Sequence, residues 1–230
     1  MRISEVFNSF QGEGIFTGYP SIFIRTAGCN LKCDWCDTKY SWGAGKEMSS
    51  AQILEQVEKY PYSEHVVITG GEPLLQRAEV ADLVVKIGLT KKITIETNGT
   101  LAPLADNYSR EVTLYSVSPK LQSAKQNLTW LPVVSHYVET YPDNLQLKFV
   151  VVTDEDYEEL KVALNSIKSH TKYLVPLILQ PNGMSNTLAE YAKAYGDLAM
   201  KVVNDPFFTA FNVRVMMQNH RVAFKQRSGI

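Results

Sequence analysis

All three cysteines of the chain lie within eight positions, at Cys29, Cys33 and Cys36 in the stretch AGCNLKCDWCDT. Three thiols on one short segment can converge on a single inorganic centre, and Gly28 allows the backbone to turn closely before the first of them. A structural zinc site, or an iron-sulfur cube held only by protein, needs four ligands. A set of three therefore predicts a centre with an open coordination position, which is typical of catalytic sites.

A zinc site completed by a histidine is the main alternative interpretation of these cysteines. The chain has four histidines, and none lies near the cysteine segment in the sequence: they are His65, His136, His170 and His220. A disulfide framework fits poorly, because it would use an even number of cysteines spread over distant elements. The cysteine spacing alone leaves zinc open.

Other polar segments follow short apolar runs along the chain. In TGGEP, residues 69–73, the paired glycines expose backbone groups to a ligand, and Glu72 can face a positive charge. Three later apolar runs are followed by ETNG at 96–99, SPK at 118–120 and QPNG at 180–183. Each segment taken alone also fits an ordinary turn. Their repeated position after apolar runs is what suggests a shared site.

The elements that must position these segments alternate between β-branched apolar runs and helical patterns, which predicts βα units around a parallel sheet. Strands are expected at 21–26, 65–69, 92–97, 113–117, 145–152 and 173–180, with a further run at 212–218. Helices are expected at 49–60, 153–169 and 186–200, and Ser49 and Thr187 begin capping-box patterns. We expect one domain over residues 1–230, an incomplete (β/α)6 barrel whose site lies at the carboxyl ends of the strands.

The composition fits a globular chain, with 45% hydrophobic and 20% charged residues. A formal net charge of -1 and scattered basic residues disfavour a nucleic-acid partner, which needs a clustered basic surface. No apolar run is long enough to cross a bilayer, and the N-terminus turns polar before a signal-like segment could form. We therefore expect a cytoplasmic protein with no membrane partner.

The C-x3-C-x2-C spacing, with Trp35 before the last cysteine, resembles the cluster motif of the radical S-adenosylmethionine (SAM) superfamily. The resemblance implies a [4Fe-4S] cluster on Cys29, Cys33 and Cys36, whose open iron binds SAM. It also implies contacts to the ammonium, carboxylate, ribose and adenine of SAM at the strand ends. The residues concerned are Gly70, Gly71, Glu72, Asn98, Ser118, Pro119, Lys120, Gln180, Pro181, Asn182 and Gly183.

The segment FNSFQGEGIFTGYPSIFIRTAGCNLKCDWCDT is more specific and resembles the 7-carboxy-7-deazaguanine synthase family. With the TGGEP, ETNG, SPK and QP motifs, the resemblance covers most of the chain. It implies a radical SAM lyase that contracts 6-carboxy-5,6,7,8-tetrahydropterin to 7-carboxy-7-deazaguanine with loss of ammonia, in queuosine and 7-deazapurine biosynthesis. The cluster and the SAM-derived radical carry this chemistry, so no side chain is assigned as catalytic.

The same resemblance implies the residues that bind the substrate, which are Phe10, Gln11, Gly12, Glu13 and Thr69. Arg25 offers a planar fork that suits the substrate carboxylate, although a salt-bridging arginine on an edge strand is the other interpretation. Thr38 is implied as a Mg2+ ligand, with substrate oxygens and water completing the shell. A threonine at this position can equally cap a turn.

The family further implies a homodimer and an external electron donor such as flavodoxin or ferredoxin. The C-terminal segment keeps Gln218, His220 and Arg221 but ends in Ile230 rather than in proline, so the tail is given no role. Whether Lys148 faces the pocket is left open.

Two other functions also stay open on the sequence. A radical SAM activase, which abstracts hydrogen from a partner protein, would leave the QGEG loop at 11–14 without a role. A non-catalytic iron-sulfur or zinc module would leave the TGGEP and SPK loops idle. A colourless, zinc-containing protein that does not cleave SAM after anaerobic purification would favour the module.

Overall fold

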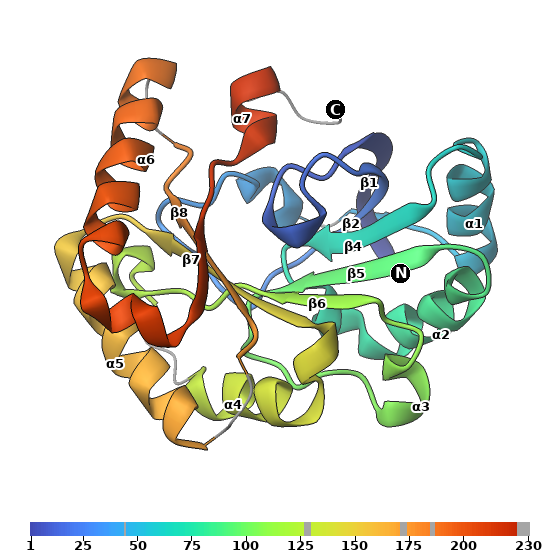
Figure 1. The fold of residues 1–230 in the computed structure, drawn as a ribbon. Coiled ribbons are helices and arrows are strands. Elements are labelled where there is room, and N and C mark those ends of the chain that lie inside the picture. The colour runs from blue at the N-terminus through green and yellow to red at the C-terminus, as the bar shows by residue number, and fades with distance from the viewer. Residues whose placement is uncertain (44, 127–129, 171–173, 185–186, 225–230) are drawn as a thin grey trace.

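The computed structural model describes residues 1–43, 45–126, 130–170, 174–184 and 187–224, which form one curved sheet covered by helices (Figure 1). Within these residues the sheet has nine strands in the order β3-β1-β2-β4-β5-β6-β7-β8-β9. Strand β1 is antiparallel to β2 and β3, and the strands from β2 through β4 to β9 are parallel. The strands are β1 (Arg2–Phe10), β2 (Pro20–Thr26), β3 (Lys46–Glu47), β4 (His65–Gly70), β5 (Lys92–Thr97), β6 (Leu114–Val117), β7 (Leu145–Val151), β8 (Pro176–Pro181) and β9 (Asn212–Val215).

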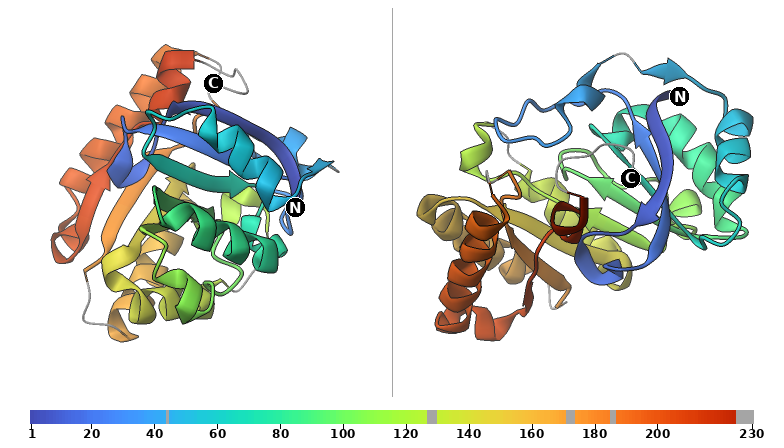
Figure 2. Two further views of the ribbon diagram at one scale, coloured as in Figure 1. Left: turned by 90° about the vertical axis from the view of Figure 1, so that its right-hand side faces the viewer. Right: turned by 90° about the horizontal axis from the view of Figure 1, so that it is seen from above.

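Helices cover the outer face of the sheet, and the last helix lies at its open end, near β1 (Figures 1 and 2). This arrangement is an incomplete α/β barrel and confirms the expected fold class. The helices are α1 (Ser50–Glu58), α2 (Arg77–Gly88), α3 (Asp106–Ser109), α4 (Leu131–Thr140), α5 (Asp154–His170), α6 (Leu188–Val203) and α7 (Asn219–Phe224). In the described part of the chain, no helix combines the length and the apolar character needed to span a bilayer.

Local sequence signals account for several of these boundaries. The Ser49 side chain accepts from the backbone N–H of Gln52 and the Gln52 side chain accepts from the backbone N–H of Ser49, so the expected capping box at α1 is confirmed. The second expected capping box, between Thr187 and Glu190, is confirmed at α6. Strand β8 begins at Pro176 rather than at 173, and position 173 lies outside the described residues.

Strand β1 was not expected from the sequence. It pairs with β2 over most of its length, from Ile3 opposite Thr26 to Phe10 opposite Pro20, with one irregularity between Ile3 and Glu5. Strand β2 therefore lies between β1 and β4, inside the sheet. The interpretation of Arg25 as a residue on an edge strand is wrong for this reason.

The core lies between the outer face of the sheet and the helices. Ile24, Ile68 and Ile95 are fully buried on three neighbouring strands, and Leu83 and Val84 of α2 belong to the same apolar cluster. Burial of each such side chain contributes about 1.5–3 kcal/mol, so this layer fixes the strands whose opposite face forms the site.

Candidate active site

A cavity of about 450 Å³ opens at the carboxyl ends of the parallel strands. Successive side chains of a strand point to opposite faces, so an apolar residue in the core is followed by a residue facing the cavity. Five strands show this pattern, with the pairs Ile24 and Arg25, Ile68 and Thr69, Ile95 and Glu96, Leu147 and Lys148, and Leu179 and Gln180. The fold thereby places polar groups from distant parts of the chain around one space.

The cavity unites the motifs that were recognised separately in the sequence. Every residue assigned to the site from the sequence lines it, with three exceptions: Glu72, Pro119 and Pro181. The cysteine loop, the glycine pair, the QGEG loop and the C-terminal segment all contribute to its wall. The expectation that the motifs meet at the strand ends therefore agrees with the geometry.

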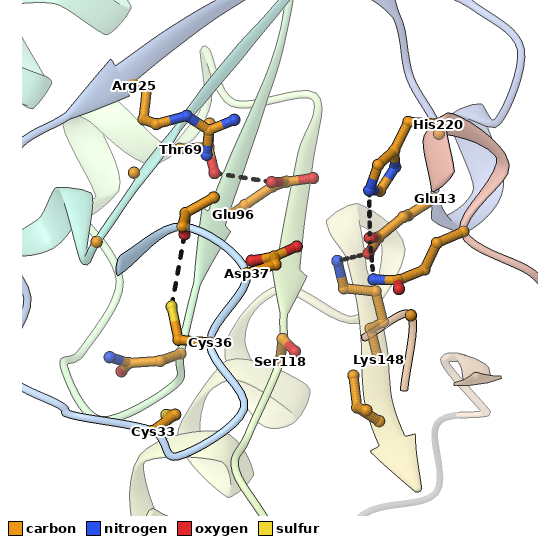
Figure 3. Close-up of a pocket in the computed structure, with 18 of the residues that line it drawn as sticks. Glu13, Arg25, Cys33, Cys36, Asp37, Thr69, Glu96, Ser118, Lys148 and His220 are labelled. Atoms are coloured by element: carbon orange, nitrogen blue, oxygen red, sulfur yellow. Dashed lines mark hydrogen bonds and ion pairs between the residues drawn. The ribbon is translucent and has the colours of Figure 1, made fainter. Parts of the chain in front are cut away.

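The three cysteines line the cavity as free thiols on one loop. The backbone N–H of Leu31 lies 3.4 Å from Cys29 Sγ, and Thr38 Oγ1 lies 3.6 Å from Cys36 Sγ (Figure 3). Burial raises the pKa of the Cys29 and Cys33 thiols, so both favour the protonated form, and a cationic centre bound to them would stabilise the thiolates.

The donor set fits a cluster better than a single metal ion. Among the described residues, no three His, Cys, Asp or Glu side chains form a group that could hold one ion. Three thiols that each bind a different iron need not meet at one point. Two of the histidines considered for zinc have other partners: His65 contacts Ser21 and Thr94, each at 2.8 Å, and His136 contacts Thr140. The side chain of His170 lies outside the described residues.

The glycine pair packs directly against the cysteine loop. A Cβ atom on Gly71 would lie 2.1 Å from the carbonyl oxygen of Gly28, and one on Gly70 would lie 2.3 Å from that of Thr26. Gly70 also has a φ of 142°, which disfavours other residues. Both glycines line the cavity, and the absence of a side chain lets their loop pack directly on the backbone of residues 26–28.

Glu72 has a different place from the one expected. Its fully buried carboxylate accepts hydrogen bonds from Leu74 N at 3.0 Å, Asn98 N at 2.7 Å and Thr97 Oγ1 at 2.9 Å. The carboxylate does not line the cavity. The expectation that it faces a ligand cation is corrected: Glu72 ties the loops after β4 and β5 together and thereby positions Asn98.

The cysteine loop is held from its other side by residues 121–126. Trp35 Nε1 donates to Ser123 Oγ at 3.0 Å, and Asp34 N donates to the carbonyl of Ala124 at 3.2 Å. The backbone N–H of Ser123 in turn donates to Asp156 Oδ1 at 2.9 Å, at the start of α5. Lys120 lies next to this contact, with Nζ 5.9 Å from the centre of the Trp35 ring and hydrogen-bonded to Ser118.

Glu13 forms a polar hub on the opposite side of the cavity (Figure 3). Lys148 Nζ pairs with its carboxylate, Gln180 Nε2 donates to Oε2 at 3.1 Å, and Gln218 Nε2 donates to Oε1 at 2.7 Å. His220 Nε2 lies 4.0 Å from Oε1. Burial alone would raise the pKa of Glu13, but Lys148 and these contacts lower it to about 2. Lys148, whose direction the sequence left open, therefore faces the cavity.

Arg25 lines the cavity and also forms an ion pair. Its Nε lies 2.7 Å from Glu5 Oε1 on β1, and its guanidinium lies near the rings of Phe7 and Tyr40. Burial lowers the pKa of Arg25, but Tyr40 and Glu5 outweigh it and raise the pKa above the ordinary value. The guanidinium is thus charged, and it points toward Thr69 within the cavity (Figure 3).

Glu96 is the main cavity residue that the sequence analysis did not assign. Its carboxylate accepts from Gln11 Nε2 at 3.1 Å and from Thr69 Oγ1 at 2.8 Å. It therefore joins two residues that the family resemblance assigns to the substrate. The sequence feature that could have predicted this role is the position of Glu96 directly after the buried Ile95. Side chains alternate along β5, so Glu96 faces the cavity.

Comparisons with known proteins identify the family of the chain. The family model of the Radical SAM superfamily matches residues 23–172. The chain is 32% identical to a 7-carboxy-7-deazaguanine synthase of Thermoplasma acidophilum over 230 residues, which cover 100% of both chains. It is 37% identical to the corresponding synthase of Hyperthermus butylicus over 212 residues, 87% of each. The crystal structure of QueE from Escherichia coli matches with a TM-score of 0.66 and 28% identity, covering 95% of this chain and 94% of that one. The chain therefore belongs to the 7-carboxy-7-deazaguanine synthase family of the radical SAM superfamily.

Proposed function

We propose that this protein converts 6-carboxy-5,6,7,8-tetrahydropterin into 7-carboxy-7-deazaguanine with ring contraction and loss of ammonia. This makes it a carbon-nitrogen lyase of queuosine and 7-deazapurine biosynthesis, acting in the cytoplasm. The observation that supports the proposal is that the thiols, the glycine pair and the QGEG loop line one cavity. A carbon radical reacts with almost any nearby C–H bond, so it must form beside its substrate in an enclosed space.

We assign the cofactors to one side of this cavity. Cys29, Cys33 and Cys36 would hold a [4Fe-4S] cluster, and together with SAM it supplies the radical that takes hydrogen from the substrate. The backbone of Gly70 and Gly71 lines the cavity and would offer hydrogen-bonding groups to the methionine part of SAM. The other assigned SAM contacts are Asn98, Ser118 and Lys120, with Asn182 and Gly183 at the adenine.

The substrate lies, in this proposal, between Arg25 and the QGEG loop. Glu5 engages Nε of Arg25, and the terminal nitrogens are the fork that receives the substrate carboxylate. The backbone of residues 10–12 supplies donors and acceptors at the pterin edge. Glu96 holds Gln11 and Thr69 in fixed orientations, which reduces the ordering cost of binding.

Thr38 is the proposed protein ligand of Mg2+, with substrate oxygens and water filling the other positions. Its hydroxyl lines the cavity, and within the described residues its side chain does not cap the short helix that follows. The turn-capping interpretation therefore has no support from a hydrogen bond. A hard oxygen ligand beside a carboxylated substrate fits the preference of magnesium.

The proposal extends to organisation and partners. We expect the whole of residues 1–230 to act as one radical SAM domain and to form a homodimer. An external donor such as flavodoxin or ferredoxin would supply the electron for SAM cleavage.

Turnover by anaerobically reconstituted protein tests the function. With SAM, Mg2+, a reductant and the carboxytetrahydropterin, we expect 7-carboxy-7-deazaguanine and released ammonia, and a much slower reaction when Mg2+ is chelated. Cleavage of SAM without ring contraction would keep the superfamily assignment and reject this substrate. An unchanged rate after removal of Mg2+ would reject the role of Thr38.

A further inference from the structure

Gln180 differs from two other buried glutamines, Gln11 and Gln146, in how its amide is used. Gln11 uses both ends of its amide, because Nε2 donates to Glu96 at 3.1 Å and Oε1 accepts from Glu13 N at 3.1 Å. Gln146 likewise donates to Ser116 at 2.8 Å and accepts from Ile15 N at 2.9 Å. Gln180 donates to Glu13, but its Oε1 is buried and has no hydrogen-bond partner among the described residues.

The orientation of the Gln180 amide is fixed by its neighbour. A carboxylate only accepts hydrogen bonds, and the low pKa of Glu13 keeps it charged. The NH2 end of the amide must therefore face Glu13, because the opposite orientation would bring two acceptors together. Oε1 is then directed away from the carboxylate.

An unpaired buried acceptor is costly, and folded proteins satisfy most such groups. Gln180 is 1% exposed and lines the cavity. The sheet fixes the position of Gln180, because the residue belongs to β8 and pairs in register with Val150 of β7. A rigid acceptor that the protein leaves unmatched is best explained by a donor on the ligand.

We propose that Gln180 is a substrate-specificity residue, whose Oε1 accepts an N–H hydrogen bond from the pterin. Both the pterin and the adenine of SAM carry N–H donors, and the family resemblance placed Gln180 at the adenine. The structure favours the pterin, because Gln180 shares the Glu13 carboxylate with Lys148 and Gln218, and Glu13 belongs to the QGEG loop. The inference rests on the proposed function.

Glu13 and Lys148 act through Gln180 in this scheme. Lys148 keeps the Glu13 carboxylate charged, and the carboxylate holds the amide in the orientation that presents Oε1. A preformed acceptor rejects a ligand without the matching donor more strongly than an apolar wall would. The hub therefore provides positioning, and Gln180 provides the contact.

Steady-state kinetics of Gln180→Leu and Gln180→Asn test the inference. Leucine is close in size but has no acceptor, and asparagine retains an amide but withdraws it from the cavity. For both we expect KM for the pterin to rise about ten- to a hundredfold, as for loss of one buried hydrogen bond. KM for SAM and the rate of SAM cleavage without pterin should change much less than KM for the pterin, because in this inference Gln180 contacts the pterin and not the adenine. A merely structural defect would lower that cleavage as well.

The control and the opposing outcomes are defined in the same assay. Gln56→Leu changes a glutamine on α1 whose side chain accepts from Lys59, and both KM values should stay at wild-type levels. A rise in KM for SAM with an unchanged pterin KM would overturn the inference in favour of the adenine, and no change in either KM would overturn it outright. Absence of pterin turnover by the wild-type protein would instead reject the proposed function, so the two failures are distinguishable.

Discussion

The two sides of the cavity are built in opposite ways. On the cysteine side, the contacts of the thiols are weak, with Leu31 N at 3.4 Å from Cys29 and Thr38 Oγ1 at 3.6 Å from Cys36. On the polar side, the carboxylate of Glu13 already has Lys148 and two glutamine amides as partners. The thiols on the cysteine side therefore need a bound cluster to hold them together. The polar side chains around Glu13 are already held by one another without a ligand.

In the proposed function, this difference follows from what each side binds. A cluster brings strong metal-ligand bonds and positive charge, so the protein needs only to hold thiols on a firm loop. An organic heterocycle brings weaker contacts and must be oriented, which requires groups that are fixed beforehand. The sheet provides both, because residues 121–126 support the cysteine loop and strands β7 and β8 support the hub.

The largest effect is expected when a cluster ligand is removed. Cys36→Ser should abolish the intact cluster and lower product formation about a thousandfold or more, since the radical can no longer form. Iron and sulfide analysis together with turnover checks this. The circular dichroism spectrum should stay unchanged, because the thiol makes only weak contacts in the protein. Full iron content and activity in this variant would mean that the three-cysteine side has been misidentified.

On the polar side, substitutions should mainly lower the free energy of unfolding. Glu13→Gln leaves Lys148 as an uncompensated buried cation, and we expect a loss of about 3–5 kcal/mol in the free energy of unfolding. Adding Lys148→Met to this variant should restore most of the loss. Urea denaturation at pH 7 of the two single variants and the double variant measures the coupling. Additive losses would show that the pair does not act as a unit.

Low pH should weaken the stabilisation that the ion pair of Glu13 and Lys148 provides. The pKa of Glu13 is lowered from 4.5 to about 2, so the unfolded chain binds the proton more tightly and the stabilisation is complete above pH 4.5. It is lost as the pH falls from 4.5 toward 2, by about 3 kcal/mol in total. Urea midpoints over this range should fall more steeply for the wild-type protein than for the double variant Glu13→Gln, Lys148→Met. Equal slopes would place the acid sensitivity elsewhere.

The smallest of these effects is expected at the glycine pair. Gly71→Ala places a Cβ 2.1 Å from the carbonyl of Gly28, so the loops must separate at a cost of about 1–3 kcal/mol. SAM affinity should fall with it, since the backbone presented to the cofactor moves. Gly196→Ala in α6 is the matched control: outside the backbone of the helix itself, no atom of the described residues lies within 4 Å of the added Cβ, and the helix should gain about 0.5–1 kcal/mol. Thermal unfolding and SAM binding separate the two variants.

The sequence predicted those parts of the molecule that depend on local pattern. The strand at 92–97, both capping boxes and the convergence of motifs at strand ends follow from periodicity, turn chemistry and the barrel rule. Strand β1 was not predicted, because the polar residues Ser4, Glu5, Asn8 and Ser9 interrupt its apolar alternation. Its pairing with β2 supplies the order that its own sequence lacks.

Contacts between distant residues were beyond the reach of local pattern. Glu13 and Lys148 are 135 positions apart, and neither neighbourhood indicates its partner. The carboxylate of Glu72 was predicted to face a ligand because its motif suggested it, but Thr97 and Asn98 bind it in the interior. Only the register of the strands decides such pairings.

The electron paramagnetic resonance spectrum of the reduced, anaerobically prepared protein, recorded before and after addition of SAM, tests the central claim most directly. If three thiols hold a cluster and one iron awaits the cofactor, SAM should change the signal of the reduced cluster. A cluster signal that is identical with and without SAM would show a centre with no open position and would contradict the account.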